Sequence, residues 1–278
     1  MSKLQIGTLL RCAHMEERRL ALYKSIGMDC IQIAGVYEDY LAPTEEARKA
    51  SDDLMALLKK HGLQVPSMFL SYPNQDWAHP REGIGLVPEK TRVERMILSC
   101  RLMVWAHKYG INSITCHVGF VPEKADPAYN GFIADMKQLV RFAASLGQEF
   151  LFETGTETVA DLKQNLADID EPNLGINFDP ANLLIYGNDD PAVLVDTLCD
   201  RIRVVHCKDA RRALEGEKKG KETVLGEGQT HFAVLLKRIL ESGFDGPLII
   251  ERELAPGPEQ EKDITEAVKL IQSIINKE

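Results

Sequence analysis

The 278-residue sequence lacks any long hydrophobic run and any excess of positive charge. No stretch approaches the roughly 20 apolar residues of a membrane-spanning helix, and residues 1–10 lack the layout of a secretory signal. The 42 acidic and 33 basic side chains give a net charge of −9, whereas nucleic acid is bound mainly through clustered Lys and Arg. These absences predict a cytoplasmic protein with neither a membrane nor a nucleic acid as its partner.

The chain also lacks paired cysteines and any segment that resembles a linker. The six cysteines are scattered, with no CxxC pair and no short spacing suited to a structural zinc site, so we expect reduced, mostly buried thiols. No Pro- or Ser-rich stretch, low-complexity tract or internal repeat separates two domains. Since 278 residues suit one large hydrophobic core, we expect a single domain over residues 1–278.

Short β-branched or apolar runs alternate with amphipathic segments of helical period along the whole chain. This alternation is typical of parallel strands joined by crossover helices. We place eight strands, at residues 5–10, 30–34, 64–70, 113–118, 149–153, 175–179, 203–206 and 248–251. Helices are predicted between them, for example over residues 44–61, 88–109, 158–169 and 231–242.

Eight units in 278 residues give about 35 residues per unit, which suits a closed (β/α)8 barrel, the TIM barrel. A left-handed residue is expected where a helical pattern ends, and glycine stands there at positions 27, 62, 110, 147 and 243. The two longest irregular stretches, residues 72–87 and 210–230, follow the third and seventh predicted strands. In this architecture they border the face that holds the active site.

Four late strands end in a side chain that can bind a metal or transfer a proton: Glu153, Asp179, His206 and Glu251. Because side chains alternate along a strand, all four are expected to point inward at the mouth of the barrel. Three carboxylates and one imidazole crowded together would repel one another and lose hydration, so the arrangement needs a cation or a shared proton. Alternatively, each residue taken alone is a solvated rim charge or a hydrogen-bonded imidazole.

A divalent metal ion satisfies this requirement most simply. An oxygen-rich set of ligands with a single nitrogen suits Mn²⁺ or Mg²⁺, with Co²⁺ or Zn²⁺ as alternatives. The sequence therefore predicts one divalent metal ion, with Glu153, Asp179, His206 and Glu251 as its ligands. Glu253 faces the same way as Glu251 and is an alternative ligand.

Five motifs in the second half of the chain carry a resemblance to a known family. They are Phe-Glu-Thr at 152–154, Asn-Phe-Asp-Pro-Ala-Asn at 177–182, Val-His-Cys-Lys-Asp at 205–209, Leu-Gly-Glu-Gly at 225–228 and Ile-Glu-Arg-Glu at 250–253. The chain resembles the xylose isomerase-like TIM barrel superfamily, the sugar phosphate isomerase/epimerase group that includes ketose 3-epimerases and inosose dehydratases. The resemblance implies that the four residues bind one metal and that Glu153 and Glu251 are also the catalytic acid/base pair.

The resemblance implies a metal-dependent sugar or polyol isomerase or epimerase. One glutamate removes the proton next to the substrate carbonyl, the metal stabilises the enediolate, and the other glutamate returns the proton. The nearest alternative is an inosose-type dehydratase, a lyase that uses the same metal site. A non-catalytic sugar-binding barrel is a further alternative, since a fold alone does not establish activity.

Four more residues are candidates for binding the small-molecule sugar or polyol. By resemblance His117 touches substrate, and Arg212 stands where ketose 3-epimerases have an arginine that contacts substrate, although Arg211 beside it leaves the register open. Asn182 replaces a histidine of several relatives and can hydrogen-bond a sugar hydroxyl. Lys208 either binds the substrate or pairs with a neighbouring carboxylate. Barrels of this group often pair through helices or rim loops, so a homo-oligomer is also among the expectations.

Overall fold

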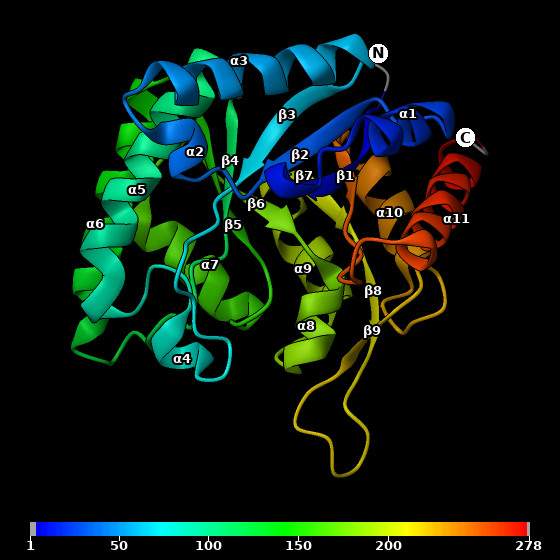
Figure 1. Ribbon diagram of the computed structural model, residues 1–278. Coiled ribbons are helices and arrows are strands. Elements are labelled where there is room, and N and C mark those ends of the chain that lie inside the picture. The colour runs from blue at the N-terminus through cyan, green and yellow to red at the C-terminus, as the bar shows by residue number, and fades with distance from the viewer. Residues whose placement is uncertain (1–3, 277–278) are drawn as a thin grey trace.

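Eight parallel strands close into a barrel, in a computed structural model that describes residues 4–276 (Figure 1). Around the barrel the hydrogen-bonded order is β1-β10-β7-β6-β5-β4-β3-β2. The strands are β1 (Ile6–Arg11), β2 (Cys30–Ala34), β3 (Gln64–Phe69), β4 (Ser113–Cys116), β5 (Glu149–Glu153), β6 (Leu174–Phe178), β7 (Ile202–Cys207) and β10 (Leu248–Ile250). The predicted TIM barrel and its eight strands are confirmed, with strand ends that differ by no more than two residues.

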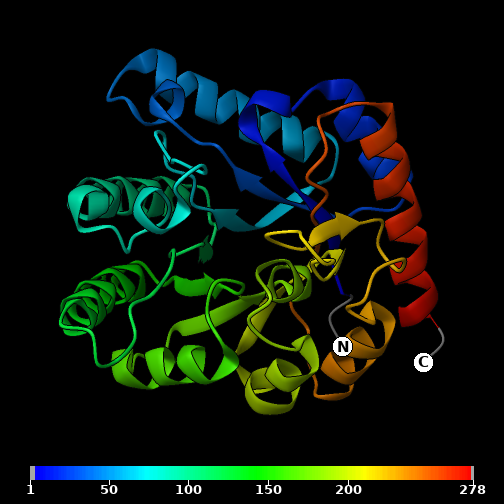
Figure 2. The same ribbon diagram turned by 90° about the horizontal axis from the view of Figure 1, so that it is seen from below.

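Helices surround the barrel, as the view along its axis shows (Figure 2). The longer ones are α1 (Glu17–Ser25), α3 (Glu45–Lys60), α5 (Glu89–Lys108), α6 (Ala128–Ser145), α7 (Val159–Ile169), α9 (Pro191–Leu198), α10 (Phe232–Glu241) and α11 (Pro258–Ile275). Between them lie three short helices, α2 (Glu38–Leu41), α4 (Pro80–Gly83) and α8 (Pro180–Tyr186), and two 3₁₀ turns, η1 (Cys12–His14) and η2 (Cys199–Arg201). None of the helices within residues 4–276 has the length and hydropathy needed to cross a membrane.

The hydrophobic core has two layers, because successive side chains of a strand point to opposite faces. Phe150 and Phe152 of β5 are buried among the helices outside the barrel. Leu151, between them, is buried inside with Cys30, Val204 and Ile249 in a small cluster that fills the barrel interior, as inward layers do in this fold. The same alternation brings the side chains at the ends of these strands inward at the mouth.

The stretch from residue 210 to 230 was expected to be irregular, but it contains an antiparallel hairpin. Strands β8 (Asp209–Arg211) and β9 (Lys221–Thr223) pair beside the barrel mouth. Each strand has only three residues and a largely polar sequence, so no apolar alternation reveals it. The side chain of Asp209 anchors the segment that follows, because it accepts hydrogen bonds from the backbone N–H groups of Gly226, Gly228 and Thr230.

Five glycines stand at helix ends with left-handed backbone, as expected. Their φ values are 100° for Gly27, 64° for Gly62, 72° for Gly110, 69° for Gly147 and 90° for Gly243. Each lies between a helix and the strand after it, so these residues turn the chain back into the barrel.

Candidate metal centre

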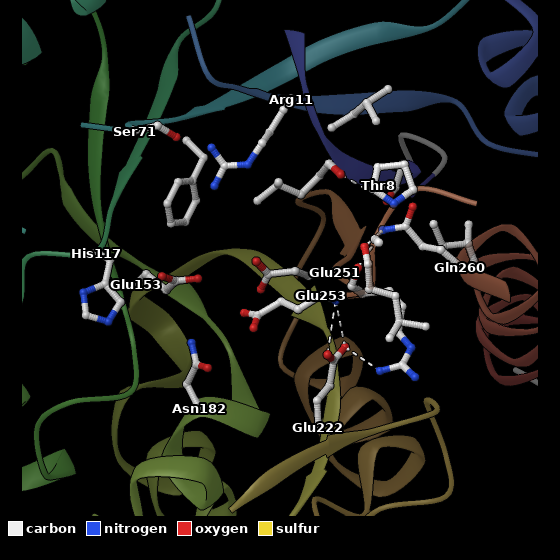
Figure 3. A pocket seen from close by; sticks show the side chains of 18 of the residues that line it. Thr8, Arg11, Ser71, His117, Glu153, Asn182, Glu222, Glu251, Glu253 and Gln260 are labelled. Atoms are coloured by element: carbon white, nitrogen blue, oxygen red, sulfur yellow. Dashed lines mark hydrogen bonds and ion pairs between the residues drawn. The ribbon is translucent and has the colours of Figure 1, made fainter. Parts of the chain in front are cut away.

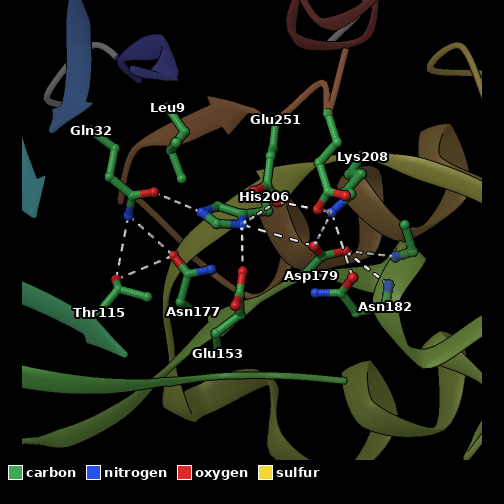
Figure 4. A network of polar contacts seen from close by, with 12 residues as sticks. Leu9, Gln32, Thr115, Glu153, Asn177, Asp179, Asn182, His206, Lys208 and Glu251 are labelled. Carbon is green, nitrogen blue, oxygen red and sulfur yellow. Dashed lines mark hydrogen bonds and ion pairs between the residues drawn. The ribbon is translucent and has the colours of Figure 1, made fainter. Parts of the chain in front are cut away.

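Glu153, Asp179, His206 and Glu251 come together at the mouth of the barrel (Figure 4). They lie at the ends of β5, β6, β7 and β10, which are neighbours in the barrel. One donor atom from each of the four lies within 4.8 Å of the others. Four side chains that are far apart in the sequence therefore form one cluster that could hold a metal ion.

The two carboxylate oxygens of Asp179 have different roles, one in capping a helix and one at the cluster. Asp179 is the N-cap residue of α8, and its Oδ1 accepts hydrogen bonds from the backbone N–H groups of Ala181 at 2.8 Å and Asn182 at 3.1 Å. Its Oδ2 is buried and has no hydrogen-bond partner among residues 4–276, although the Lys208 ammonium lies 3.5 Å away. The cap therefore fixes the carboxylate while Oδ2 remains free for a ligand.

The orientation of the His206 ring is set by Gln32 of β2. Gln32 donates through Nε2 to Ser67 Oγ at 2.7 Å, which turns its Oε1 to within 2.7 Å of His206 Nε2. A carbonyl oxygen can only accept, so Nε2 of His206 carries a proton and Nδ1 faces the cluster. Burial disfavours the imidazolium, but the carboxylates around the ring hold the pKa of His206 well above its usual value, so Nδ1 also carries a proton that a bound metal ion would replace. Nδ1 is buried and makes no hydrogen bond of good geometry within the residues that the structure describes; it lies 3.1 Å from Glu153 Oε1 and 3.2 Å from Glu251 Oε2.

The two glutamates of the cluster lie in different electrostatic environments. Burial raises the pKa of Glu153 to about 7. Burial also acts against the Glu251 carboxylate, but the charges of Lys208 and His206 outweigh it and hold the pKa of Glu251 well below its usual range. The two carboxyl groups are thus distinguished by their neighbours, which is the condition for an acid and a base to act in one site.

Lys208 supplies a fixed positive charge beside the cluster. It is 1% exposed, and its Nζ lies 2.6 Å from Glu253 Oε1 and 3.1 Å from Glu251 Oε2. Burial disfavours the ammonium group, but the carboxylates around it hold the pKa of Lys208 well above its usual value. The expected pairing of Lys208 with neighbouring carboxylates is confirmed, and its contact with substrate stays a prediction.

The donor set fits a divalent cation. Asp179 Oδ2 and His206 Nδ1 are buried and have no hydrogen-bond partners in the described part of the chain, an arrangement that is costly unless something binds there. Three carboxylates and one imidazole match the ligands that Mn²⁺ and Mg²⁺ accept, and no thiol takes part. Glu253, the alternative ligand, instead contacts Lys208.

A cavity of about 720 Å³ opens above this cluster (Figure 3). Glu153 and Glu251 lie in its wall, together with His117, Asn182 and Trp77. Trp77 is 58% exposed and meets the His117 ring edge-on at 6.2 Å, so it borders the cavity and is not packed in a core. A cavity of this size accommodates a small molecule.

His117, which lines this cavity, holds its ring proton on Nε2. The backbone N–H of Gly119 donates to His117 Nδ1 at 3.2 Å, so the ring proton resides on Nε2. Burial lowers the pKa of His117 to about 4, which keeps the ring neutral at physiological pH. Nε2 is buried and has no partner within the described part of the chain.

Arg212 lies apart from the other candidates. Its guanidinium donates to the backbone carbonyl of Asp189 at 3.2 Å, and it is absent from the cavity lining. Its contact with substrate stays a prediction. Asn182, in contrast, lines the cavity, and its Oδ1 lies 3.5 Å from Lys208 Nζ.

Two contributors to the site were missed from the sequence. Gln32 lies within the buried strand Cys-Ile-Gln-Ile-Ala, and a single amide in an otherwise apolar strand was the signal that could have revealed it. Glu222 of β9 accepts from the backbone N–H of Glu253 and pairs with Arg252 at 3.1 Å, linking the hairpin to the end of β10. Because the hairpin was not expected, nothing pointed to Glu222.

Comparison with known proteins places the chain in a family. The family described as Xylose isomerase-like TIM barrel matches residues 20–274. The chain belongs to this family. Relatives that the chain matches include inosose dehydratases, and a solved D-tagatose 3-epimerase-like protein, 18% identical, covers 98% of this chain and 97% of its own and superimposes with a TM-score of 0.72.

Individual relatives are similar at modest identity. An inosose dehydratase of Lacticaseibacillus casei is 28% identical over 151 residues, which is 49% of this chain and 50% of the relative, so the match spans half of that protein. An inosose dehydratase of Geobacillus kaustophilus is 25% identical over 250 residues, 77% of this chain and 76% of the relative. A solved xylose isomerase domain protein from Planctomyces limnophilus is 29% identical, covers 99% of this chain and 97% of its own, and superimposes with a TM-score of 0.88.

Proposed function

We propose that the protein is a divalent-metal-dependent enzyme that removes the proton next to the carbonyl of a ketose or keto-polyol, as an isomerase or epimerase. One observation carries the proposal. Glu153 and Glu251 meet at a single centre with Asp179 and His206, and both glutamates lie in the wall of a 720 Å³ cavity. A protein that only bound a sugar would not need two carboxyl groups that face one centre in the wall of its cavity.

Each residue has a role in this proposal. Glu153, Asp179, His206 and Glu251 hold the metal, which when bound supplies a Lewis acid that stabilises negative charge developing on the substrate oxygens. Glu153 accepts the proton, because burial makes it more basic than an ordinary carboxylate. Lys208 holds Glu251 in its charged form. For return of a proton to the opposite face, Glu251 therefore first takes up a proton from water, and Glu153 releases the one that it accepted.

Substrate orientation is assigned to the cavity wall. The Nε2–H of neutral His117 donates to a substrate oxygen, and Asn182 offers an amide to a hydroxyl group. Trp77 provides an exposed aromatic face for the apolar side of a sugar ring. Return of the proton to the opposite face gives an epimer, and return to the neighbouring carbon gives an isomer.

A dehydratase is the second candidate, because the curated relatives reported above are inosose dehydratases. The first step is the same removal of an α-proton. In the dehydratase the hydroxyl group on the next carbon then leaves as water, so that no proton returns to the substrate carbon. The two candidates therefore differ in the fate of the carbanion and not in the residues that form it.

Incubation of ketoses and keto-inositols in D₂O with the Mn²⁺-loaded protein separates these outcomes. Deuterium at an epimerised or isomerised carbon, detected by NMR, supports the first candidate, and loss of one water molecule, detected by mass spectrometry, supports the second. Glu153→Gln should lower kcat by about 10²–10⁴-fold with unchanged circular dichroism.

Glu253→Gln is the matched control. The side chain of Glu253 is 62% exposed, and its carboxylate contacts Lys208 and is not one of the four clustered groups. The variant should retain activity within about tenfold of the parent protein. Full activity in Glu153→Gln, or in metal-free protein, would show that the proposed chemistry is wrong. Failure to exchange any substrate proton would favour a binding protein.

A further inference from the structure

Helix α5 has a row of exposed apolar side chains that the barrel does not use. Val93, Ile97 and Val104 are 69%, 59% and 51% exposed, and partly buried Cys100 lies between them. Their spacings of four, three and four residues place all four side chains on one face of the helix. In the view along the barrel axis, α5 lies at the outer edge of the ring of helices, so this face points away from the barrel (Figure 2).

The apolar row continues into a surface groove of about 940 Å³. Cys100 and Val104 line the groove together with Tyr40 and Leu41 of α2 and Phe142 of α6. The exposed apolar surface therefore extends from α5 onto both neighbouring helices. Contiguous apolar surface of this kind marks interaction sites more often than scattered single residues do.

We propose that this face binds a second copy of the chain, with the two α5 helices packed antiparallel across a two-fold axis. The row has the four-three spacing of a coiled-coil seam, and it is symmetric about its centre. An antiparallel partner therefore places its own Cys100 opposite Ile97 and its own Val104 opposite Val93. A face that matches itself in this way fits the isologous contact of a two-fold dimer.

The charges beside the row favour the antiparallel arrangement. Glu94 and Arg101 both lie on one flank of the row, and antiparallel pairing places Glu94 of each copy beside Arg101 of the other. Both side chains are exposed, and Arg101 already pairs with Glu38 at 2.6 Å, which holds its guanidinium on this face. Parallel pairing would instead place Glu89 beside the Glu94 carboxylate of the other copy, where the two charges repel.

Polar residues end the row on both sides. Lys90 lies three residues before the row and His107 three residues after it, on the same face of the helix. In the antiparallel dimer, Lys90 of each copy lies beside His107 of the other, at the two edges of the contact. An apolar centre with a polar rim is the usual composition of a protein interface.

The first test measures the mass of the full-length protein by light scattering during size exclusion. The expected mass is twice the 31.1 kDa of one chain. Ile97→Glu should raise the dissociation constant of the dimer at least about tenfold, because both copies lose a central contact. Val234→Glu, at an equally exposed valine of α10, should leave the dimer intact. A monomer at every concentration, or a dimer that is unaffected by Ile97→Glu, would overturn the proposal.

The second test examines the register of the two helices through disulfide formation. Ile97→Cys should form a disulfide with the partner's Cys100 under mild oxidation, giving a dimer on a non-reducing gel. The double variant Ile97→Cys/Cys100→Ser should lose most of this product. If the double variant cross-links as well as the single one, residue 97 faces its own copy and the antiparallel register is wrong. Circular dichroism of each variant verifies that the barrel is folded.

Discussion

Gln32 Oε1 lies 2.7 Å from His206 Nε2, across the interior of the barrel. The two residues belong to β2 and β7, which are separated by β1 and β10 in the order of strands. The amide also contacts Ser67, Thr115 and Asn177, so its orientation is fixed by three strands at once. A side chain from the first half of the chain thus sets the tautomer of a candidate metal ligand in the second half (Figure 4).

We expect Gln32→Leu to weaken Mn²⁺ binding by about 10–100-fold, because the imidazole loses the acceptor that fixes its tautomer and its orientation. Calorimetric titration of the metal-free variant measures this change without recourse to turnover. Thr115→Val is the control, since it removes one partner of Gln32 and leaves the contact with His206 in place. Equal Mn²⁺ affinity in Gln32→Leu and the parent protein would contradict this role of the amide.

Removal of the metal should lower the stability of the barrel. A ligand present at 100 times its dissociation constant stabilises the folded state by about 2.7 kcal/mol, so EDTA should lower the melting temperature by several degrees and Mn²⁺ should restore it. Asp179→Asn keeps the shape of the helix cap but loses the charge at Oδ2, and its melting temperature should respond little to Mn²⁺. Asp245→Asn, at an exposed carboxylate outside the site, should respond as the parent protein does.

Glu157 gives the protein a pH-dependent stability. It is 8% exposed, its Oε1 has no hydrogen-bond partner between residues 4 and 276, and burial raises its pKa from 4.5 to about 7. The folded state holds this proton more tightly than the unfolded chain does. Its contribution is therefore complete below pH 4.5 and is lost as the pH rises through about 7.

Between pH 5 and pH 8 the parent protein should lose about 2–3 kcal/mol of unfolding free energy relative to Glu157→Gln, which carries no titrating group at this position. Urea unfolding of both proteins at the two pH values, with EDTA present throughout, measures the difference. The prediction is wrong if the two proteins change stability in parallel, or if the parent protein gains stability relative to the variant.

Asp209 should be essential for the order of the segment after β9. Its carboxylate accepts from the backbone N–H groups of Gly226 and Gly228 at 3.0 Å and from Thr230 Oγ1 at 2.7 Å. Asp209→Asn places an amide donor against these donors, so we expect a loss of about 2–4 kcal/mol and faster hydrogen exchange at the two glycine amides. Thr230→Val removes one hydrogen bond and should cost about 1 kcal/mol. A larger loss in Thr230→Val than in Asp209→Asn would contradict this role.

The barrel could be predicted because its strands carry strong apolar patterns of the right length. Residues 30–34 and 149–153 were placed without error, since β-branched or aromatic side chains fill them and a glycine or a polar segment ends the preceding helix. The convergence of Glu153, Asp179, His206 and Glu251 followed from two simple rules. Side chains alternate along a strand, and parallel strands end at the same edge.

The rest of the site depends on contacts between elements that no local pattern encodes. That Lys208 turns toward Glu251 and Glu253 depends on how β7 and β10 lie beside each other. The β8–β9 hairpin is held by Asp209 and by Glu222, which are tertiary contacts of polar residues. The exposed row on α5 could not be predicted, because apolar side chains lie on both faces of this helix and its sequence does not indicate which face meets the barrel.

All four clustered side chains come from strands β5, β6, β7 and β10, whereas Trp77 and His117 reach the cavity from the segments after β3 and β4. One part of the cavity wall therefore lies in a different stretch of the sequence from the four clustered side chains, whereas Asn182, which also lines the cavity, follows β6. Insertions or exchanges after β3 and β4 can therefore reshape this part of the cavity wall while the four clustered groups keep their places. With this division, the shape of the cavity can change while the four groups at the ends of the strands stay the same.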